Sequence, residues 1–205
     1  MSGRGGPLVW LPLLLALSCG GKDKSADAGG AANDGGTASQ GANVTCANYC
    51  HRVMAACTGE NAVYVNDQAC LAVCALLEPG DAQEPRGNTV ACRSAQAASA
   101  EREPEAYCAA AGPGGNGACG SDCEAYCALY PQACPSETEE QGTQSCLEAC
   151  SALVDQPSFD LITDHQGDTL ECRLVHLASA TLSPAEHCHH ARLAPTQPWC
   201  VPERP

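Results

Sequence analysis

The spacing of the cysteines constrains this chain more than any other feature. Of its 17 cysteines, all but one fall into two sets of eight. The intervals are 4, 7, 13, 4, 18, 16 and 11 residues in the first set and 4, 7, 12, 4, 22, 16 and 12 in the second. Such matching predicts two tandem repeats, residues 44–120 and 121–205. The first set is Cys46, Cys50, Cys57, Cys70, Cys74, Cys92, Cys108 and Cys119, and the second is Cys123, Cys127, Cys134, Cys146, Cys150, Cys172, Cys188 and Cys200.

The composition indicates that disulfides replace a large core. Only 4 % of the 205 residues are aromatic, and Phe159 is the single phenylalanine. A chain with so little bulky apolar surface gains stability from cross-links, which restrict the unfolded ensemble. We therefore expect the sixteen repeated cysteines to form disulfides in an oxidising compartment.

The charge argues against one class of partner. Residues 44–205 contain seven arginines and 21 acidic residues, which accounts for the whole formal charge of −14. An acidic surface repels phosphate backbones, so we expect no nucleic-acid partner. Solubility is the simplest role for this charge.

The first 43 residues predict export and anchoring. Residues 1–18 have the features of a signal peptide, with Arg4 before an apolar stretch at 8–17 that is too short to span a bilayer. The residues before Cys19 resemble a bacterial lipobox, although Ala16 stands where that pattern usually has leucine. We expect Cys19 to be lipidated, which leaves an even number of cysteines for disulfides; the alternative is a secreted protein with a spare cysteine. Residues 19–43 would comprise this lipidated cysteine and a flexible Gly- and Ala-rich tether, spanning about 27 Å.

Helix signals place each repeat in the all-α, small disulfide-rich class, with about three short helices per repeat. Good N-cap residues precede the first cysteines, and Gly-Asn-Thr or Gly-Asp-Thr precedes the third helix of each repeat. In repeat 2, Asp168 followed by Glu171 resembles a capping box. The last cysteines would lie in a turn and loop. The expected helix starts are Thr45, Asp67 and residues 87–89 in repeat 1 and Asp122, Thr143 and residues 167–169 in repeat 2.

Each Cys-x3-Cys motif places two sulfurs on one helix face. Two such helices that face each other would be joined by nested disulfides. These are Cys46–Cys74 and Cys50–Cys70 in repeat 1, and Cys123–Cys150 and Cys127–Cys146 in repeat 2. For the remaining cysteines we expect Cys57–Cys92 and Cys108–Cys119, with the matching pairs Cys134–Cys172 and Cys188–Cys200.

Motifs for known chemistry are missing from the sequence. There is no Cys-x2-Cys, which excludes zinc ribbons, thioredoxin-type dithiols and covalent haem attachment. There is also no Walker motif, His-Glu-x2-His or Gly-x-Ser-x-Gly. We therefore predict that the protein is not an enzyme.

Four histidines of repeat 2 are the candidate metal ligands. They lie around Cys172 and Cys188, and imidazole is a common ligand of copper, zinc and nickel. Repeat 1 has Gln96, Tyr107, Ala109 and Ala110 at the matching places. We expect either a transition-metal site in repeat 2 or packing and surface roles. The four are His176, His187, His189 and His190.

Two further matched pairs are expected to be structural. Arg93 and Arg173 each follow a helical cysteine, so helix-end carbonyls or an acidic neighbour are the expected partners. Tyr49 and Tyr126 would supply the largest apolar side chains of two small cores, with hydroxyls that reach water.

The segment GDTLECRLVH at 167–176, together with PAEHCHHA at 184–191, is similar to a group of cysteine-rich lipoproteins of myxobacterial type. These carry a Gly-Asn-Thr-Leu-x-Cys-Arg-x-x-His … His-Cys-x-His-Ala segment. The resemblance covers most of 121–205 and, more weakly, 44–120, where every histidine is replaced. It implies a location in the cell envelope and no particular activity.

We therefore predict a bacterial cell-envelope lipoprotein with a non-enzymatic binding or structural role. Its lipid anchor would hold it to a membrane, on the periplasmic or surface face of the outer membrane, with an envelope protein or ligand as partner. A metal- or haem-binding module that uses the histidines of repeat 2 is the first alternative. A secreted enzyme of unknown class is the second.

Overall fold

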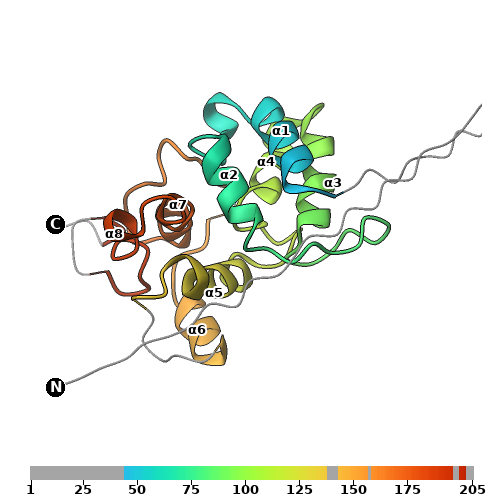
Figure 1. Ribbon diagram of the computed structural model, residues 1–205. Helices are drawn as coiled ribbons and strands as arrows, with labels where there is room; N and C mark the ends of the chain where they lie inside the picture. Colours follow the sequence, from blue (N-terminus) through green and yellow to red (C-terminus); the bar gives the residue numbers. More distant parts are fainter. Residues whose placement is uncertain (1–43, 138–142, 157, 196–198, 202–205) are drawn as a thin grey trace, which may run out of the picture. The chain divides into compact units, whose positions relative to one another are not determined.

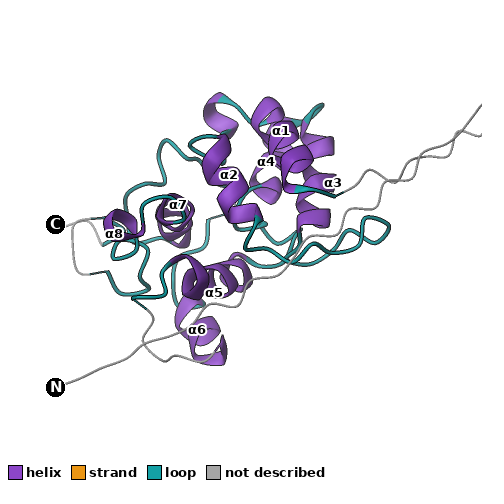
Figure 2. Ribbon diagram, in the orientation of Figure 1, coloured by secondary structure: helices purple, strands orange, loops and turns teal. Residues whose placement is uncertain are grey.

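All regular structure in the described residues is helical (Figures 1 and 2). The computed structural model describes residues 44–137, 143–156, 158–195 and 199–201. The predicted signal peptide at 1–18, the lipidation at Cys19 and the tether at 19–43 lie outside these ranges. The prediction of a small all-α, disulfide-rich fold is confirmed.

Repeat 1 contains four α-helices and a 3-10 helix. α2 and α3 pack against α1, and α4 packs against both α1 and α3. The sequence predicted three helices and a terminal loop, but part of that loop is α4, which begins at Pro104. Proline at the first helical position suits a helix start. The elements are α1 (Cys46–Ala56), η1 (Gly59–Asn61), α2 (Asp67–Cys74), α3 (Val90–Ala100) and α4 (Pro104–Ala111).

Repeat 2 has the same order of helices. α5 packs against α6 and α7, and α7 packs against the short α8, which again begins with a proline. α2 of repeat 1 also packs against α7, and Nε2 of Gln132 donates to the carbonyl of Leu76 at 3.2 Å. Described residues of both repeats therefore lie in one compact unit. The elements are α5 (Asp122–Ala133), α6 (Thr143–Cys150), α7 (Leu170–Ala180) and α8 (Pro184–His187).

The helix caps differ from the prediction at two places in repeat 2. Ser121, not Asp122, caps α5, and it forms a capping box with Glu124. Thr169, not Asp168, caps α7, as Thr89 caps α3. A threonine hydroxyl directly before the helix reaches the N–H three residues on, which leaves the Asp168 carboxylate free for another partner.

The sixteen cysteines of the two sets form eight disulfides. The structure contains the four nested pairs expected from the Cys-x3-Cys motifs. The other four predicted pairs are wrong, because α4 packs against α1 and brings Cys108 to the end of that helix. The observed pairs are Cys57–Cys108, Cys92–Cys119, Cys134–Cys188 and Cys172–Cys200.

Peptide mapping under non-reducing conditions is expected to recover a peptide pair joined by Cys57–Cys108 and another joined by Cys134–Cys188. Both cross-links follow from the packing of the fourth segment of each repeat. A peptide that joins Cys57 to Cys92 would contradict this connectivity.

Tyr49 and Tyr126 fill matching places in the two cores. Each side chain is only 1 % exposed. The Tyr126 hydroxyl donates to the carbonyl of Ala191 at 2.7 Å, and Tyr49 donates to that of Ala111. The prediction that these hydroxyls reach water is wrong, because the last segment of each repeat folds back over them and supplies a carbonyl acceptor.

Replacing Tyr126 by phenylalanine is expected to lower the free energy of unfolding by about 1–3 kcal/mol, because it leaves the buried carbonyl of Ala191 without its donor. Chemical denaturation measures the change. Tyr107→Phe, at a partly exposed residue of α4, is the control and should change stability by less than about 0.5 kcal/mol. Equal effects of the two substitutions would contradict the role of this hydrogen bond.

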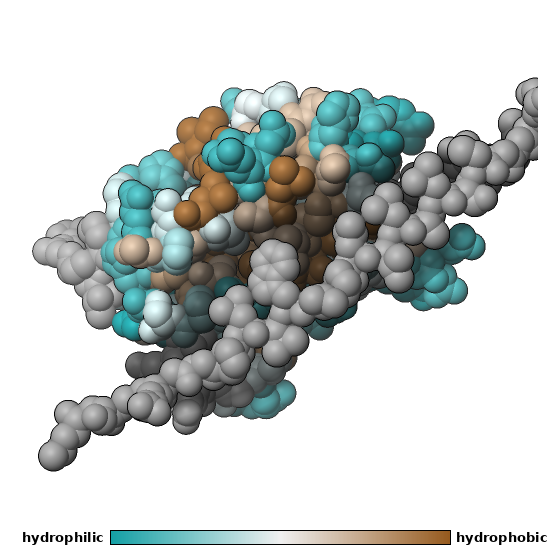
Figure 3. All heavy atoms as spheres, in the orientation of Figure 1, coloured by the Kyte–Doolittle hydropathy of each residue, from teal (hydrophilic) through white to brown (hydrophobic). Residues whose placement is uncertain are grey.

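On the face drawn in Figure 3, hydrophobic patches are separated by hydrophilic residues. None of the helices within the described ranges has the length and apolar composition of a membrane span.

Candidate metal centre

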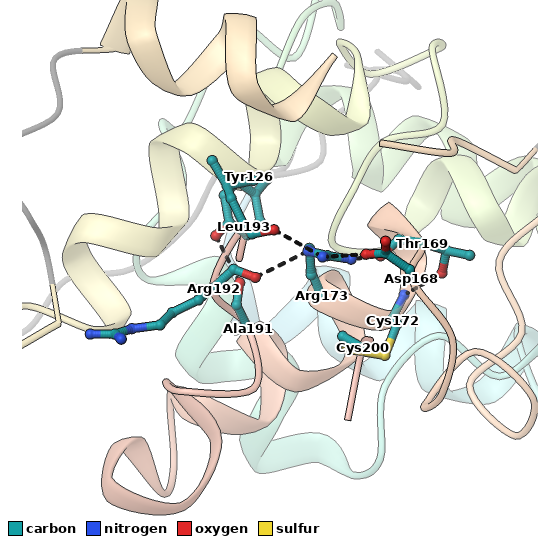
Figure 4. Close-up of polar contacts among 9 residues, drawn as sticks. All are labelled: Tyr126, Asp168, Thr169, Cys172, Arg173, Ala191, Arg192, Leu193 and Cys200. Carbon is teal, nitrogen blue, oxygen red and sulfur yellow. Dashed lines mark hydrogen bonds and ion pairs between the residues drawn. A yellow bond between two sulfur atoms is a disulfide. The ribbon is translucent and has the colours of Figure 1, made fainter. Parts of the chain in front are cut away.

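Arg173 fixes the chain that follows α8. This side chain is 1 % exposed, and its guanidinium donates in two directions (Figure 4). Towards the start of α7, it donates to the carbonyl of Thr169 at 2.7 Å and to the Asp168 carboxylate at 2.6 Å. Towards the returning chain, it donates to the carbonyls of Arg192 at 3.0 Å and Leu193 at 2.9 Å. The guanidinium therefore ties residues 192–193 to α7.

Arg93 makes the same set of contacts in repeat 1. It is fully buried and donates to the carbonyls of Gly112 and Pro113, both at 2.9 Å, and to the side-chain oxygen of Asn88 at 2.8 Å. The expected acidic neighbour is therefore found for Arg173, at Asp168, and the expected helix-end carbonyl is found for Arg93, at Gly112 after α4. The two arginines position the backbone and belong to the fold.

Three of the four candidate histidines come together. His176 lies on α7, His187 ends α8, and His190 lies in the turn that Arg173 and the Cys134–Cys188 disulfide hold in place. One ring nitrogen from each lies within 4.8 Å of the other two. Nδ1 of His176 and Nδ1 of His187 lie 3.3 Å apart.

Nδ1 is the ring nitrogen of His176 that could bind a metal ion. Its Nε2 lies 3.2 Å from the carbonyl of His165. An N–H at Nε2 donates to this carbonyl, which leaves the lone pair on Nδ1, as is usual for metal-binding histidines. Burial lowers the pKa of His176 to about 4. The ring is therefore neutral at pH 7, the form that binds metal ions.

His190 is equally enclosed. It is 7 % exposed, and its Nδ1 is buried with no hydrogen-bond partner among the described residues. Burial lowers its pKa, and His189 and His187 lower it further. The ring of His189 lies beside His190, with centroids 3.9 Å apart, but His189 does not share the group of converging nitrogens. Of the four histidines predicted as ligands, three therefore have converging ring nitrogens.

Two residues of this site were missed in the sequence. The carbonyl of His165 orients His176, and the Trp199 ring lies with its centroid 6.0 Å from His176 and 6.2 Å from His190. Trp199 directly precedes Cys200, whose disulfide to Cys172 carries it to α7. Correct pairing of Cys172 would therefore have placed the tryptophan beside the histidines.

The sulfurs near His176 are not ligands. Cys172 and Cys200 lie close enough to form a group with this histidine, but they are joined in a disulfide. A metal ion is bound by thiolates, which a disulfide does not provide. The potential metal ligands of this group are therefore the three imidazoles.

Fold and site together define a small all-α, disulfide-rich protein with a group of potential metal ligands in its second repeat. Residues 21–122 match the BfoA family C-terminal domain, so this segment of the chain is similar to that family. The match ends at the start of α5, and the three histidines lie outside it. No curated protein and no solved structure matches the chain.

Proposed function

We propose that the protein is a cell-envelope lipoprotein with a non-enzymatic binding role, and that repeat 2 binds one transition-metal ion, Zn²⁺ or Cu²⁺. The ligands would be His176, His187 and His190. The convergence of their ring nitrogens is the observation that supports this proposal.

The spacing of the nitrogens suits a small ion. Two nitrogens bound to zinc at about 2.0–2.1 Å in tetrahedral geometry lie about 3.3 Å apart. This equals the 3.3 Å between Nδ1 of His176 and Nδ1 of His187. The same spacing argues against haem, because two axial imidazoles need the macrocycle between them. Three protein ligands leave the fourth position for water or a ligand from outside.

The proposed location depends on the sequence of the first 43 residues and on the disulfides. The signal-peptide-like sequence at 1–18 and the lipobox-like sequence before Cys19 support export and anchoring. Eight disulfides need an oxidising compartment. Similarity to cysteine-rich lipoproteins of myxobacterial type points to the same place.

Titration of the full chain with ZnSO₄ or CuSO₄ in a calorimeter is expected to give one bound ion per chain. Repeat 1 provides substitutions that this fold already accommodates at the matching places. His176→Gln and His190→Ala introduce the residue types of Gln96 and Ala110, and each should weaken metal binding at least about tenfold.

The matched control is His189→Ala, because repeat 1 also has alanine there, at Ala109. It removes a neighbouring imidazole without removing one of the three converging nitrogens, so metal affinity should change little. Absence of binding by the wild-type protein, or an equal loss in His189→Ala, would contradict the proposal.

A further inference from the structure

A second group of ligand-type side chains lies outside the histidine site. Asp122 is the first residue of α5, Asp155 follows α6, and Glu171 is in the first turn of α7. One carboxylate oxygen from each lies within 4.8 Å of the other two. Three acids from three separate segments therefore meet at one point, beside the loop that joins the two repeats.

This group has no ion-pair partner in the part of the chain that the structure describes. None of the ion pairs found there includes any of the three acids. Asp122 is 5 % exposed and Glu171 is fully buried, whereas Asp155 is exposed. The charge of Arg93 acts on Asp122 from beyond ion-pair distance. Burial of carboxylates without a closer partner is costly, so a native protein normally supplies a counter-charge or a proton.

The backbone fixes one oxygen of each buried acid. The N–H of Asn116 donates to Oδ1 of Asp122, and the N–H of Gln156 donates to Oε1 of Glu171, both at 2.7 Å. The second oxygen of Glu171, Oε2, is buried and has no hydrogen-bond partner among the described residues. Such hydrogen bonds orient carboxylates in the way that outer-shell contacts orient metal ligands.

The loop of repeat 1 is shaped around Asp122. A Cβ atom on Gly114 would lie 2.4 Å from Oδ1 of Asp122, so a larger residue there would displace the Asp122 side chain. Asn116, whose N–H binds the same oxygen, has a positive φ of 45°. The chain therefore accepts an unfavourable backbone conformation next to a buried carboxylate.

The carboxylates of Glu171 and Asp155 belong to the same group of converging oxygens, within 4.8 Å of each other. Two carboxylates at this distance need either a proton or a cation between them. Burial raises the pKa of Glu171 to about 7 and that of Asp122 to about 6. Near neutral pH a bound cation would therefore compete with a proton for the space between these carboxylates.

We propose that Asp122, Asp155 and Glu171 bind a divalent cation of the hard, oxygen-preferring class, namely Ca²⁺, at the junction between the two repeats. All the ligand atoms are carboxylate oxygens, which suit Ca²⁺ better than the zinc or copper that imidazoles prefer. The exposed side at Asp155 leaves room for water molecules to complete the coordination of the ion. This inference does not depend on the proposed function of the histidines.

The test is the melting temperature of the full chain as CaCl₂ is added after treatment with EDTA. Ca²⁺ should raise the melting temperature with a midpoint of about 0.1–1 mM, the range of extracellular calcium modules. Asp155→Asn and Glu171→Gln should each weaken Ca²⁺ binding at least about tenfold. Asp155 is exposed, so its variant keeps the test decisive if Glu171→Gln fails to fold.

Two controls separate this site from other effects. Glu105→Gln removes an exposed acid of α4 and should leave the calcium response unchanged, as should His176→Gln. No shift at about 10 mM CaCl₂, beyond that of NaCl at equal ionic strength, would overturn the proposal. An unchanged response in Asp155→Asn would also overturn it, and the carboxylates would then share a proton.

Discussion

Replacing Arg173 by methionine is expected to lower the free energy of unfolding by about 3–5 kcal/mol, because removal of a buried charged donor leaves its acceptors unpaired. Methionine has a similar length but no hydrogen-bond donor. The buried carbonyls of Arg192 and Leu193 would lose their partner, and Asp168 would lose its counter-ion. The side chain of Asp168 is 40 % exposed, so water would compensate that part of the loss.

Chemical denaturation of the disulfide-bonded protein measures this effect. The control is Arg192→Met, which removes an ion pair with Glu137. The side chain of Arg192 is 36 % exposed and that of Glu137 is 29 % exposed. That pair should contribute less than about 1 kcal/mol. A loss of similar size in both variants would show that Arg173 does not have the stabilising role assigned to it.

The sequence predicted those features that depend on local spacing. Cys-x3-Cys places two sulfurs on one helix face, so the nested pairs of α1 with α2 and of α5 with α6 followed from helix geometry alone. The grouping of the histidines followed from their positions near Cys172 and Cys188. In each case the prediction depends on the spacing of a few residues within one or two helices.

Features that depend on how the last segment of each repeat packs against the earlier helices were not predicted. Cys108 reaches Cys57 only because α4 packs on α1. Trp199 reaches the histidines only through the Cys172–Cys200 disulfide. The meeting of Asp155 with Glu171 also depends on tertiary packing, since the two acids come from different segments of the chain.

Comparison of the two repeats separates what the fold needs from what it does not. Arg93 and Arg173 make equivalent contacts, and so do Tyr49 and Tyr126. By contrast, repeat 1 has Gln96 in place of His176 and Ala91 in place of Glu171. Repeat 1 folds without an imidazole or a carboxylate at these places, so the fold itself does not require them in repeat 2.

Removing the Cys134–Cys188 disulfide by double substitution with alanine is expected to lower the free energy of unfolding by about 4 kcal/mol in the chain-entropy model. This disulfide joins residues 54 positions apart. Removing Cys127–Cys146, which joins residues 19 positions apart, should lower it by about 3 kcal/mol. Denaturation with guanidinium chloride compares the two variants with the wild type.

The two variants should differ much more in metal binding than in stability. Cys188 lies between His187 and His190, and its bond to α5 limits where both imidazoles can lie. Freed from it, the turn would sample many conformations, and Zn²⁺ binding should weaken at least about tenfold. Cys127–Cys146 lies on α5 and α6, away from the ligands, so its removal should leave zinc affinity nearly unchanged. Calorimetry under conditions where both variants remain folded distinguishes the two outcomes, and equal zinc affinity in both would show that this disulfide does not position the histidines.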